Sequence, residues 1–205
     1  MGLTAEQLKD GLDALAVIEP RYAPILAAVG YPEPRMRDRG YETLLRTIVG
    51  QQVSFKAADA VWAKLAAHRG DLTDPQSILS ADFDELRACG LSRQKQGYAR
   101  SLAQLIADGE LPIMTLPIDD EEAIALLTQV KGIGRWSAEI YLLFAEGRSD
   151  IWPAGDLAIQ IAVGRLMGMD ERPSEKAIRE IAEGWRPHRG AAAVFAWHFY
   201  MTPGI

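Results

Sequence analysis

The sequence holds little cysteine and no long apolar run, and each of these shortages excludes some classes of protein. Cys89 is the single cysteine among 205 residues. This excludes an intramolecular disulfide and a centre held by four cysteines. No apolar stretch approaches the length of a membrane span, and residues 1–16 lack the charged-then-apolar order of a secretory signal. We therefore expect a cytoplasmic protein without a membrane partner.

Positive charge is also in short supply. The chain carries 22 Lys and Arg residues against 28 Asp and Glu residues, a net charge of −6, which does not favour a strongly basic nucleic-acid-binding protein. The distribution of charge counts for more than its sum, however. Cations gather in short clusters, for example Lys131 with Arg135, and Arg186 with His188 and Arg189. We therefore expect local positive patches on an otherwise acidic surface.

Helical patterns dominate the sequence. Apolar residues recur at helical spacing in one segment after another, whereas no segment alternates as a β-strand does. Residues typical of helix N-caps, such as Thr4 and Ser174, stand where such segments begin. The proline- and arginine-rich segment 31–40 is the clearest boundary in the first half of the chain. The sequence predicts an all-α protein with two helical lobes.

One stretch, residues 126–156, has the outline of two helices joined by a very short turn. Apolar helical spacing from Leu126 to Val130 stops at the sequence Lys-Gly-Ile-Gly of residues 131–134. Glycines permit a tight turn and a close approach to another molecule. The second helix is marked by an apolar stripe, which consists of Trp136, Ile140, Leu143 and Phe144. A loop follows, and then Asp156 at the start of a third helix.

Such a hairpin is suited to bind an anion. The first N–H groups of the second helix have no partner inside that helix, and the helix dipole adds partial positive charge there. A phosphate fits these donors, and Lys131, Arg135 and Ser137 lie around the same turn. The alternative is an ordinary helical hairpin whose glycines only end a helix. The carboxylate of Asp156 downstream favours the functional interpretation.

Four blocks of sequence, taken in order, resemble one family. They are IVGQQVSFKAA at residues 48–58, CGLSRQKQGY at 89–98, VKGIGRWSA at 130–138 with PAGD at 153–156, and WRPHRGAAAVFAW at 185–197. The combination resembles the helix-hairpin-helix (HhH-GPD) DNA glycosylases, in particular the 3-methyladenine DNA glycosylase II (AlkA) branch, without the extra N-terminal domain of its larger members.

The resemblance also implies how the two lobes are composed. Residues 40–150 would form a helical barrel lobe that carries the helix-hairpin-helix. Residues 1–39 and 151–205, from both termini, would form the second lobe and carry the catalytic aspartate. The active-site cleft would lie between the two lobes.

The activity that the resemblance implies is that of a monofunctional DNA glycosylase in base excision repair. Such an enzyme flips an alkylated purine, of the 3-methyladenine or 7-methylguanine type, out of double-stranded DNA and hydrolyses its N-glycosidic bond, which leaves an abasic site. Asp156 falls on the catalytic aspartate, whose carboxylate stabilises the positive charge that develops on the sugar. The alternative is that Asp156 only caps the helix beginning at Leu157. We expect the enzyme to act as a monomer.

The base pocket implied by the resemblance is aromatic. Trp136 and Trp197 match positions that line it, and Tyr141 lies next to Ile140, which takes the place of a pocket tyrosine. Indole faces attract a cationic alkylated base by roughly 0.5–2 kcal/mol. The alternative for each tryptophan is a place in the core. Relatives that also cut the DNA backbone carry a lysine where Trp136 stands, so we expect no AP-lyase activity.

DNA contacts are implied at the hairpin and at one other helix junction. Two adjacent glutamines fall where the family reaches into the duplex, and Gln52 occupies the position that fills the gap left by the extruded base. The alternative is a pair of ordinary surface residues. The implied DNA-binding residues are Gln51, Gln52, Lys131, Gly132, Gly134, Arg135 and Ser137.

No cofactor is required by the resemblance. It does imply a monovalent cation, Na+ or K+, held at the hairpin by the backbone carbonyls of Thr128, Val130 and Ile133. The single cysteine leaves no room for the four-cysteine iron–sulfur cluster of some relatives. The scattered histidines do not match the spacing of a zinc site.

Two other functions remain compatible with the sequence. Within the enzyme class, the substrate would be another lesion, such as an etheno or a deaminated base. Outside it, the chain would be a non-catalytic helix-hairpin-helix DNA-binding protein. The match at Asp156 favours the enzyme, and a helical bundle for protein interactions would leave the four ordered blocks unexplained.

Overall fold

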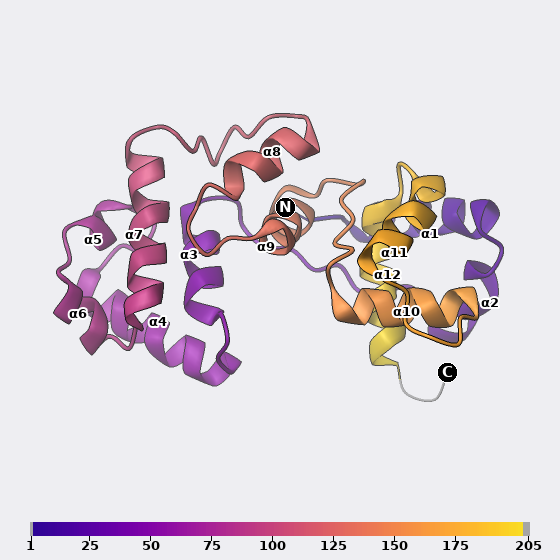
Figure 1. Ribbon diagram of the computed structural model, residues 1–205, viewed down its shortest axis with the longest axis horizontal. Helices are drawn as coiled ribbons and strands as arrows, with labels where there is room; N and C mark the ends of the chain where they lie inside the picture. The colour runs from indigo at the N-terminus through magenta and orange to yellow at the C-terminus, as the bar shows by residue number, and fades with distance from the viewer. Residues whose placement is uncertain (1, 203–205) are drawn as a thin grey trace. The chain divides into compact units, whose positions relative to one another are not determined.

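The structure is a computed structural model that describes residues 2–202 (Figure 1). Every regular element in that range is helical, from α1 (Ala5–Ile18) to α12 (Arg189–Met201), which confirms the all-α prediction. None of the helices described has the length and apolar character that crossing a membrane requires.

Contacts divide the chain into two units. The middle unit consists of residues 38–141, and the terminal unit consists of the described parts of residues 1–37 and 142–205. The sequence predicts that residues 142–150 belong to the middle lobe, whereas the structure places them in the terminal unit. Residues 38–39, expected in the terminal lobe, belong to the middle unit.

Two contacts explain why residues 142–150 belong to the terminal unit. The backbone amide of Gly190 donates a hydrogen bond to the carbonyl of Ser149 at 2.7 Å. The next residue, Asp150, forms an ion pair with Arg189 at 2.9 Å. Partners that lie about 40 residues away along the chain cannot be read from local spacing.

The middle unit is built around α7 (Arg93–Ala107). This helix packs against α3 (Tyr41–Gly50) and against the short helices α5 (Gln76–Leu79) and α6 (Phe83–Ala88), while α4 (Phe55–Arg69) packs on α3 (Figure 1). The core of these helices is aliphatic, and its fully buried side chains include Leu44, Leu45, Ile48, Leu65, Ile78, Leu86 and Leu102.

The predicted helix–hairpin–helix is present at the end of the middle unit. Its two helices, α8 (Asp120–Leu127) and α9 (Arg135–Tyr141), contact each other, and α9 also contacts α3. After Tyr141 the helix changes to a π-helical segment, η1 (Leu142–Glu146), with which the terminal unit resumes. Such π segments are rare and are frequently found near functional sites.

The terminal unit is built around α12. This helix packs against α1, α2 (Tyr22–Val29) and α10 (Leu157–Met167). A side chain on Gly11 of α1 would come within 2.8 Å of the Ala191 methyl group on α12, so glycine allows these two helices to approach closely.

An aromatic cluster completes the core of the terminal unit. The ring of Trp185, in the short helix η2 (Glu183–Trp185) that follows α11 (Glu175–Ala182), meets the ring of Tyr22 edge-on with centroids 5.4 Å apart. It meets the ring of Trp152 in the same way at 5.5 Å. Edge-to-face pairs of this kind add to the stability that burial alone provides.

Helix starts follow the local sequence closely. Thr4 and Gln7 form a complete capping box at α1, and Asp82 with Glu85 forms another at α6. In each box the side chains satisfy N–H groups that lack a partner within the helix. Other N-cap side chains that accept a backbone hydrogen bond are Ser54, Ser92, Asp119, Asp156 and Ser174.

Candidate functional site

The hairpin, defined here as residues 128–134, is a tight turn that requires glycine at position 132. The amide of Ile133 donates to the carbonyl of Val130 at 3.0 Å and closes the turn. Gly132 has φ +84°, a conformation that other residues rarely adopt. A side chain at this position would also overlap the ring of Tyr98 on α7.

Gly134, in contrast, has no steric reason of its own to be glycine. Its φ is not positive, and a side chain at this position would meet no other atom within 4 Å. The open space beside Gly134 therefore suits a close approach by a partner from outside the chain. In the first turn of α9, the amide of Ala138 donates to the Gly134 carbonyl at 3.0 Å. The preceding amides at the start of α9 belong to the set that an α-helix cannot satisfy internally.

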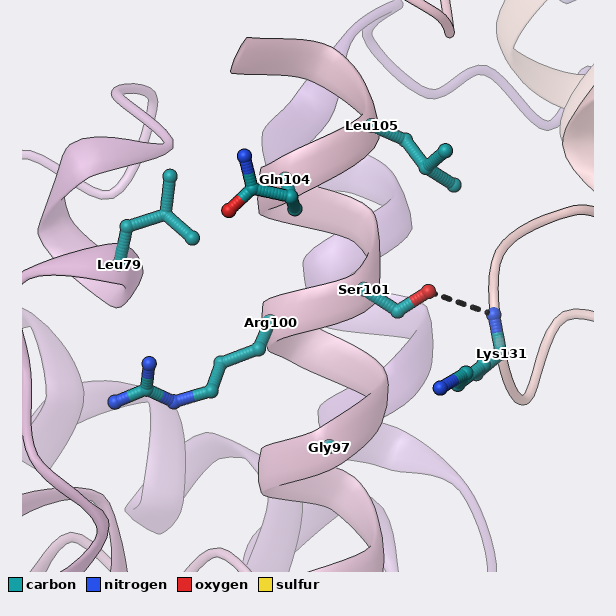
Figure 2. A pocket seen from close by; sticks show the side chains of 7 residues that line it. All are labelled: Leu79, Gly97, Arg100, Ser101, Gln104, Leu105 and Lys131. Atoms are coloured by element: carbon teal, nitrogen blue, oxygen red, sulfur yellow. Dashed lines mark hydrogen bonds between the residues drawn. The ribbon is translucent and has the colours of Figure 1, made fainter. Parts of the chain in front are cut away.

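Lys131 is bonded to α7 through its backbone. Its backbone amide donates to the Ser101 hydroxyl at 3.1 Å, and its side chain borders a shallow pocket of about 400 Å³ on α7 (Figure 2). Arg100 also lines this pocket, but its guanidinium points away from Lys131 (Figure 2). It donates to the Ala81 carbonyl and lies over the ring of Phe83. The two cations therefore do not converge on a single anion.

The predicted DNA contact at Arg135 has partners inside the middle unit. Its guanidinium forms hydrogen bonds with both carboxylate oxygens of Glu121 on α8, one of them at 2.8 Å, and it forms an ion pair with the buried Glu139 at 2.9 Å. The hydrogen bonds with Glu121, together with the charges of both carboxylates, raise the pKa of Arg135 above its ordinary value. Arg135 thus joins the two helices that flank the hairpin, and its charge is largely neutralised.

The junction between α3 and α4 is bonded to the hairpin. The Gln51 side chain donates to the carbonyl of Gly132 at 2.8 Å. Gln52 is exposed and has φ +56°, and among residues 2–202 no other non-glycine residue has a positive φ. Left-handed backbone in such a residue costs of order 1–3 kcal/mol and is often found at functional sites. The structure bonds Gln51 to a hairpin glycine, and the contacts of both glutamines with DNA stay a prediction.

Asp156 is the N-cap of α10 in the terminal unit. Its Oδ1 atom accepts hydrogen bonds from the amides of Ala158 at 2.9 Å and Ile159 at 3.1 Å. Asp156 therefore caps the helix that begins at Leu157, as the structural alternative predicts. Capping uses Oδ1, which fixes the carboxylate in one orientation at the positive end of a helix.

The loop that leads to Asp156, residues 147–156, is fastened from several sides; we call it the Asp156 loop. The indole nitrogen of Trp152 donates to the Ile178 carbonyl at 3.2 Å, and Arg179 donates to the Trp152 carbonyl at 3.3 Å. Nearer to the acid, the Gln160 side chain donates to the Ala154 carbonyl at 2.9 Å. These bonds satisfy backbone groups that a loop would otherwise leave to water.

A cluster of charges holds the beginning of the same loop. Both oxygens of the Asp150 carboxylate accept hydrogen bonds from Arg189 at 2.9 Å, and Arg186 adds a third at 2.6 Å. Glu183 pairs with both arginines. The prediction of a positive patch at Arg186 and Arg189 is therefore wrong, because two acids neutralise the two arginines.

The three aromatic residues predicted for the base pocket differ in their surroundings. Trp136 is 45% exposed on α9, which is not the environment of a core tryptophan. Trp197 on α12 is half-buried and packs against Phe144 with ring centroids 5.5 Å apart. Tyr141 is buried, and its hydroxyl accepts a hydrogen bond from the Gly40 amide at 2.8 Å. The structure thus gives Tyr141 a structural partner, and its pocket role stays a prediction.

The residues implied for the cation have suitable chemistry. Backbone carbonyls are the oxygen ligands that hard cations prefer. The carbonyl of Val130 already accepts the hydrogen bond of Ile133, and its second lone pair fits a further partner. Between residues 2 and 202 there is no group of three or more His, Cys, Asp or Glu residues that would hold a metal ion instead.

Several residues that shape these features were not predicted. Tyr98, Ser101 and Glu121 fix the hairpin from outside it, through packing, a hydrogen bond and an ion pair. Tyr98 stands at the end of one of the four sequence blocks, which was a usable signal. Trp152, beside the loop proline, was a second signal for the residue that anchors the Asp156 loop.

The fold and the hairpin define a helix-hairpin-helix protein made of two helical units. Comparison with protein families narrows this class. The model of the HhH-GPD superfamily, described as a base excision DNA repair protein, matches residues 45–187. The chain belongs to this superfamily.

Individual relatives agree with the family assignment. DNA-3-methyladenine glycosylase 1 of Schizosaccharomyces pombe is 32% identical over 190 residues, which cover 89% of this chain and 83% of the relative. A crystal structure of a DNA-3-methyladenine glycosidase from Bacillus halodurans has a TM-score of 0.87 at 26% identity and covers 94% of this chain and 89% of its own. The structure of the S. pombe 3-methyladenine DNA glycosylase in complex with abasic DNA has a TM-score of 0.76 at 30% identity, with 93% and 95% covered.

Proposed function

We propose that this protein is a monofunctional DNA glycosylase that removes alkylated purines, of the 3-methyladenine or 7-methylguanine type, from double-stranded DNA. The observation that carries the proposal is the fixed carboxylate of Asp156, which stands at a helix N-terminus on a loop fastened by Trp152 and Gln160. Relatives named as 3-methyladenine DNA glycosylases, one of them solved with abasic DNA, support the same substrate class.

The chemistry assigned to Asp156 is electrostatic. Breaking the bond between C1′ and the base nitrogen leaves positive charge on the deoxyribose ring. A carboxylate that is already oriented stabilises this charge without rearranging in the transition state. The cap hydrogen bonds of Oδ1 provide that orientation, so the structural and the catalytic interpretations of Asp156 support each other. A water molecule then completes the hydrolysis at C1′ and leaves an abasic site.

The hairpin is proposed to hold the DNA backbone. Gly134 leaves room for a phosphate, and the amides at the start of α9 are donors for it. Lys131 and Ser137 flank this position, whereas Arg135 acts by keeping α8 and α9 together through Glu121. A monovalent cation on the carbonyls of Thr128, Val130 and Ile133 would add positive charge beside the same phosphate. Binding of phosphate by backbone donors needs few cationic side chains, which suits a chain with a net charge of −6.

Recognition of the extruded base is proposed for Trp136 and Trp197. An alkylated purine carries positive charge, which the face of an indole attracts. The exposure of Trp136 leaves its ring accessible for such a contact. Because Trp136 has no amine, this position cannot form a Schiff base with the sugar, and we infer that the enzyme does not cut the DNA backbone.

A panel of single-lesion duplexes tests this function. Base release is measured from otherwise identical duplexes that carry one 3-methyladenine analogue, 7-methylguanine, ethenoadenine or hypoxanthine. The expected result is release from the alkylated duplexes together with alkali-sensitive abasic sites. Release of only the etheno or deaminated base would shift the substrate class, and binding without any release would identify a non-catalytic DNA-binding protein.

A further inference from the structure

Helix α11 is bonded to the Asp156 loop through two consecutive residues. The carbonyl of Ile178 accepts the indole N–H of Trp152, and the guanidinium of Arg179 donates to the Trp152 carbonyl at 3.3 Å. The helix itself is anchored by the buried side chains of Ile178 and Ala182. A helix with a fixed position therefore supports the loop on the N-terminal side of Asp156.

Arg179 is held in turn by Glu175, one turn earlier on α11. Its Nε and Nη2 atoms both donate to Oε1 of Glu175, at 3.1 and 2.8 Å, whereas Nη1 is the donor to the loop carbonyl. The guanidinium is planar and rigid. Because of this, the two bonds to Glu175 also determine where the third donor points, and they direct it at the loop.

The other carboxylate oxygen of Glu175 lies beside the residue that precedes Asp156. A Cβ atom at Gly155 would lie 3.6 Å from Oε2 and 3.9 Å from Cδ of Glu175, which is ordinary van der Waals contact. Gly155 does not have a positive φ, so its backbone conformation does not require glycine. Glu175 is thus close to both ends of the segment 152–155, through Arg179 at one end and directly at the other.

An ion pair at this spacing is often only a surface feature. Exposed pairs four residues apart on a helix contribute little to stability. Helix α11 carries such a pair in Lys176 and Glu180, which are both exposed and 3.9 Å apart. The pair of Glu175 and Arg179 differs, because it is 2.8 Å long and its half-buried arginine also bonds the Asp156 loop.

We propose that Glu175 is a positioning residue, which acts through Arg179 to hold the Asp156 loop and thereby keeps the Asp156 carboxylate in its reactive position. The inference rests on the proposed function for the role of Asp156. The cap bonds to Ala158 and Ile159 orient the carboxylate from the side of α10, and Glu175 with Arg179 fixes the loop from the other side. Small displacements matter, because a shift of about 1 Å can slow a reaction about a hundredfold.

The test compares Glu175→Ala with Glu180→Ala. Both changes remove an ion-paired glutamate of α11, but only Glu175 is connected to the loop through its arginine. Base release from a duplex with one 7-methylguanine is measured at saturating protein, so that the single-turnover rate is independent of affinity. Affinity for an abasic-site duplex is measured separately, and thermal melting checks that each variant remains folded.

Glu175→Ala should slow saturated single-turnover release by about tenfold, with affinity within about twofold of wild type. Glu180→Ala should change neither quantity. Glu175→Gln retains an acceptor oxygen for Arg179 and should restore part of the rate. The double variant Glu175→Ala/Arg179→Ala should be no slower than Arg179→Ala alone, because residues that act through each other are not additive.

Amide hydrogen exchange follows the Asp156 carboxylate without relying on activity. The amides of Ala158 and Ile159 both donate to its Oδ1 atom. A loop that opens locally exposes such amides to solvent. Their exchange should therefore be faster in Glu175→Ala than in wild type, and unchanged in Glu180→Ala.

Equal release rates in the two alanine variants would overturn the positioning role, and so would a loss in Glu175→Ala that is confined to affinity. Unchanged exchange at Ala158 and Ile159 would overturn it as well. Failure of the proposed function looks different. Wild type would then release no base from the duplex, while faster exchange in Glu175→Ala would still show that Glu175 holds the loop.

Discussion

The hairpin and the Asp156 loop differ in how the hydrogen-bonding groups of their backbones are satisfied. In the hairpin, Gly134 faces open space, and α9 itself supplies no partner for the amides of its first turn. In the Asp156 loop, the Trp152 side chain donates to the carbonyl of Ile178, and the side chains of Arg179 and Gln160 donate to carbonyls of the loop. All of these partners lie within the terminal unit. One segment is arranged to bind an outside partner, and the other is arranged to hold one carboxylate still.

This contrast explains how an acidic protein can act on DNA. Several of its arginines, including Arg135 and Arg189, neutralise acids of their own unit. Binding would then depend on backbone geometry at the hairpin, whereas chemistry would depend on the charge and orientation of one side chain. Changes in the two segments should therefore affect different measured quantities.

The largest effect is expected for Asp156→Asn. Asparagine keeps the shape and caps a helix as well as aspartate does, so α10 and the thermal stability should be preserved. Loss of the negative charge should reduce single-turnover base release by about a thousandfold, with affinity for the damaged duplex within a few-fold of wild type. Retained turnover would remove the carboxylate mechanism.

A large loss of stability is expected for Arg189→Ala. The change removes the two-pronged partner of the partly buried Asp150, which keeps only Arg186, and it should lower the free energy of unfolding by about 2 kcal/mol. Lys176→Ala is the control, because its ion pair with Glu180 is exposed and 3.9 Å long, and breaking it should change stability by less than about 0.5 kcal/mol. Equal losses in chemical denaturation would show that the Asp150 cluster does not anchor the loop.

Gly132→Ala should affect the opposite segment. The added methyl group would overlap the Tyr98 ring at a position with φ +84°. We expect about tenfold weaker binding to an abasic-site duplex, because strain of about 1–3 kcal/mol would distort the turn. Gly109→Ala has a similar φ of +74° with nothing within 4 Å, and it isolates the backbone strain from the overlap. If both variants bind equally weakly, the hairpin geometry is not the cause.

Trp136→Ala should produce a smaller effect, on lesion processing. Losing the indole face should slow release of a cationic base by about tenfold, while binding to undamaged duplex should change by less than about twofold. Trp62→Ala serves as the control, because this half-buried tryptophan on α4 stacks under Arg46 at 4.0 Å. Equal losses of processing and of binding in Trp136→Ala would point to a structural role.

The last prediction is that no covalent adduct forms between the protein and DNA. Borohydride should trap no covalent adduct between the wild-type protein and duplex DNA that carries a lesion or an abasic site, since neither Trp136 nor Asp156 supplies an amine. Adduct formation is followed by the shift of labelled DNA on a denaturing gel. A trapped adduct that Lys131→Ala abolishes would overturn the monofunctional assignment and name the nucleophile.

The parts of this account that follow from the sequence are those with local causes. The starts of α1 and α10 were predicted correctly, because the caps Thr4 and Asp156 act within one helical turn. The hairpin was predicted because Gly132 must adopt a positive φ, a need that glycine makes visible in the sequence.

The parts that the sequence did not reveal have distant causes. The bond between Arg135 and Glu121, and that between Arg189 and Asp150, join residues on different elements. Each arginine therefore resembles part of an exposed positive patch until its partner is known. The change from α9 to the π-helical η1 likewise depends on packing.

The most direct measurement compares base release by Gly132→Ala and Asp156→Asn over a range of protein concentrations, from below to far above the dissociation constant. If the hairpin grips and the carboxylate reacts, Gly132→Ala approaches the wild-type single-turnover rate once the DNA is saturated, whereas Asp156→Asn stays inactive at every concentration. Recovery of Asp156→Asn at saturation, or a Gly132→Ala protein that binds fully and still releases no base, would contradict the account.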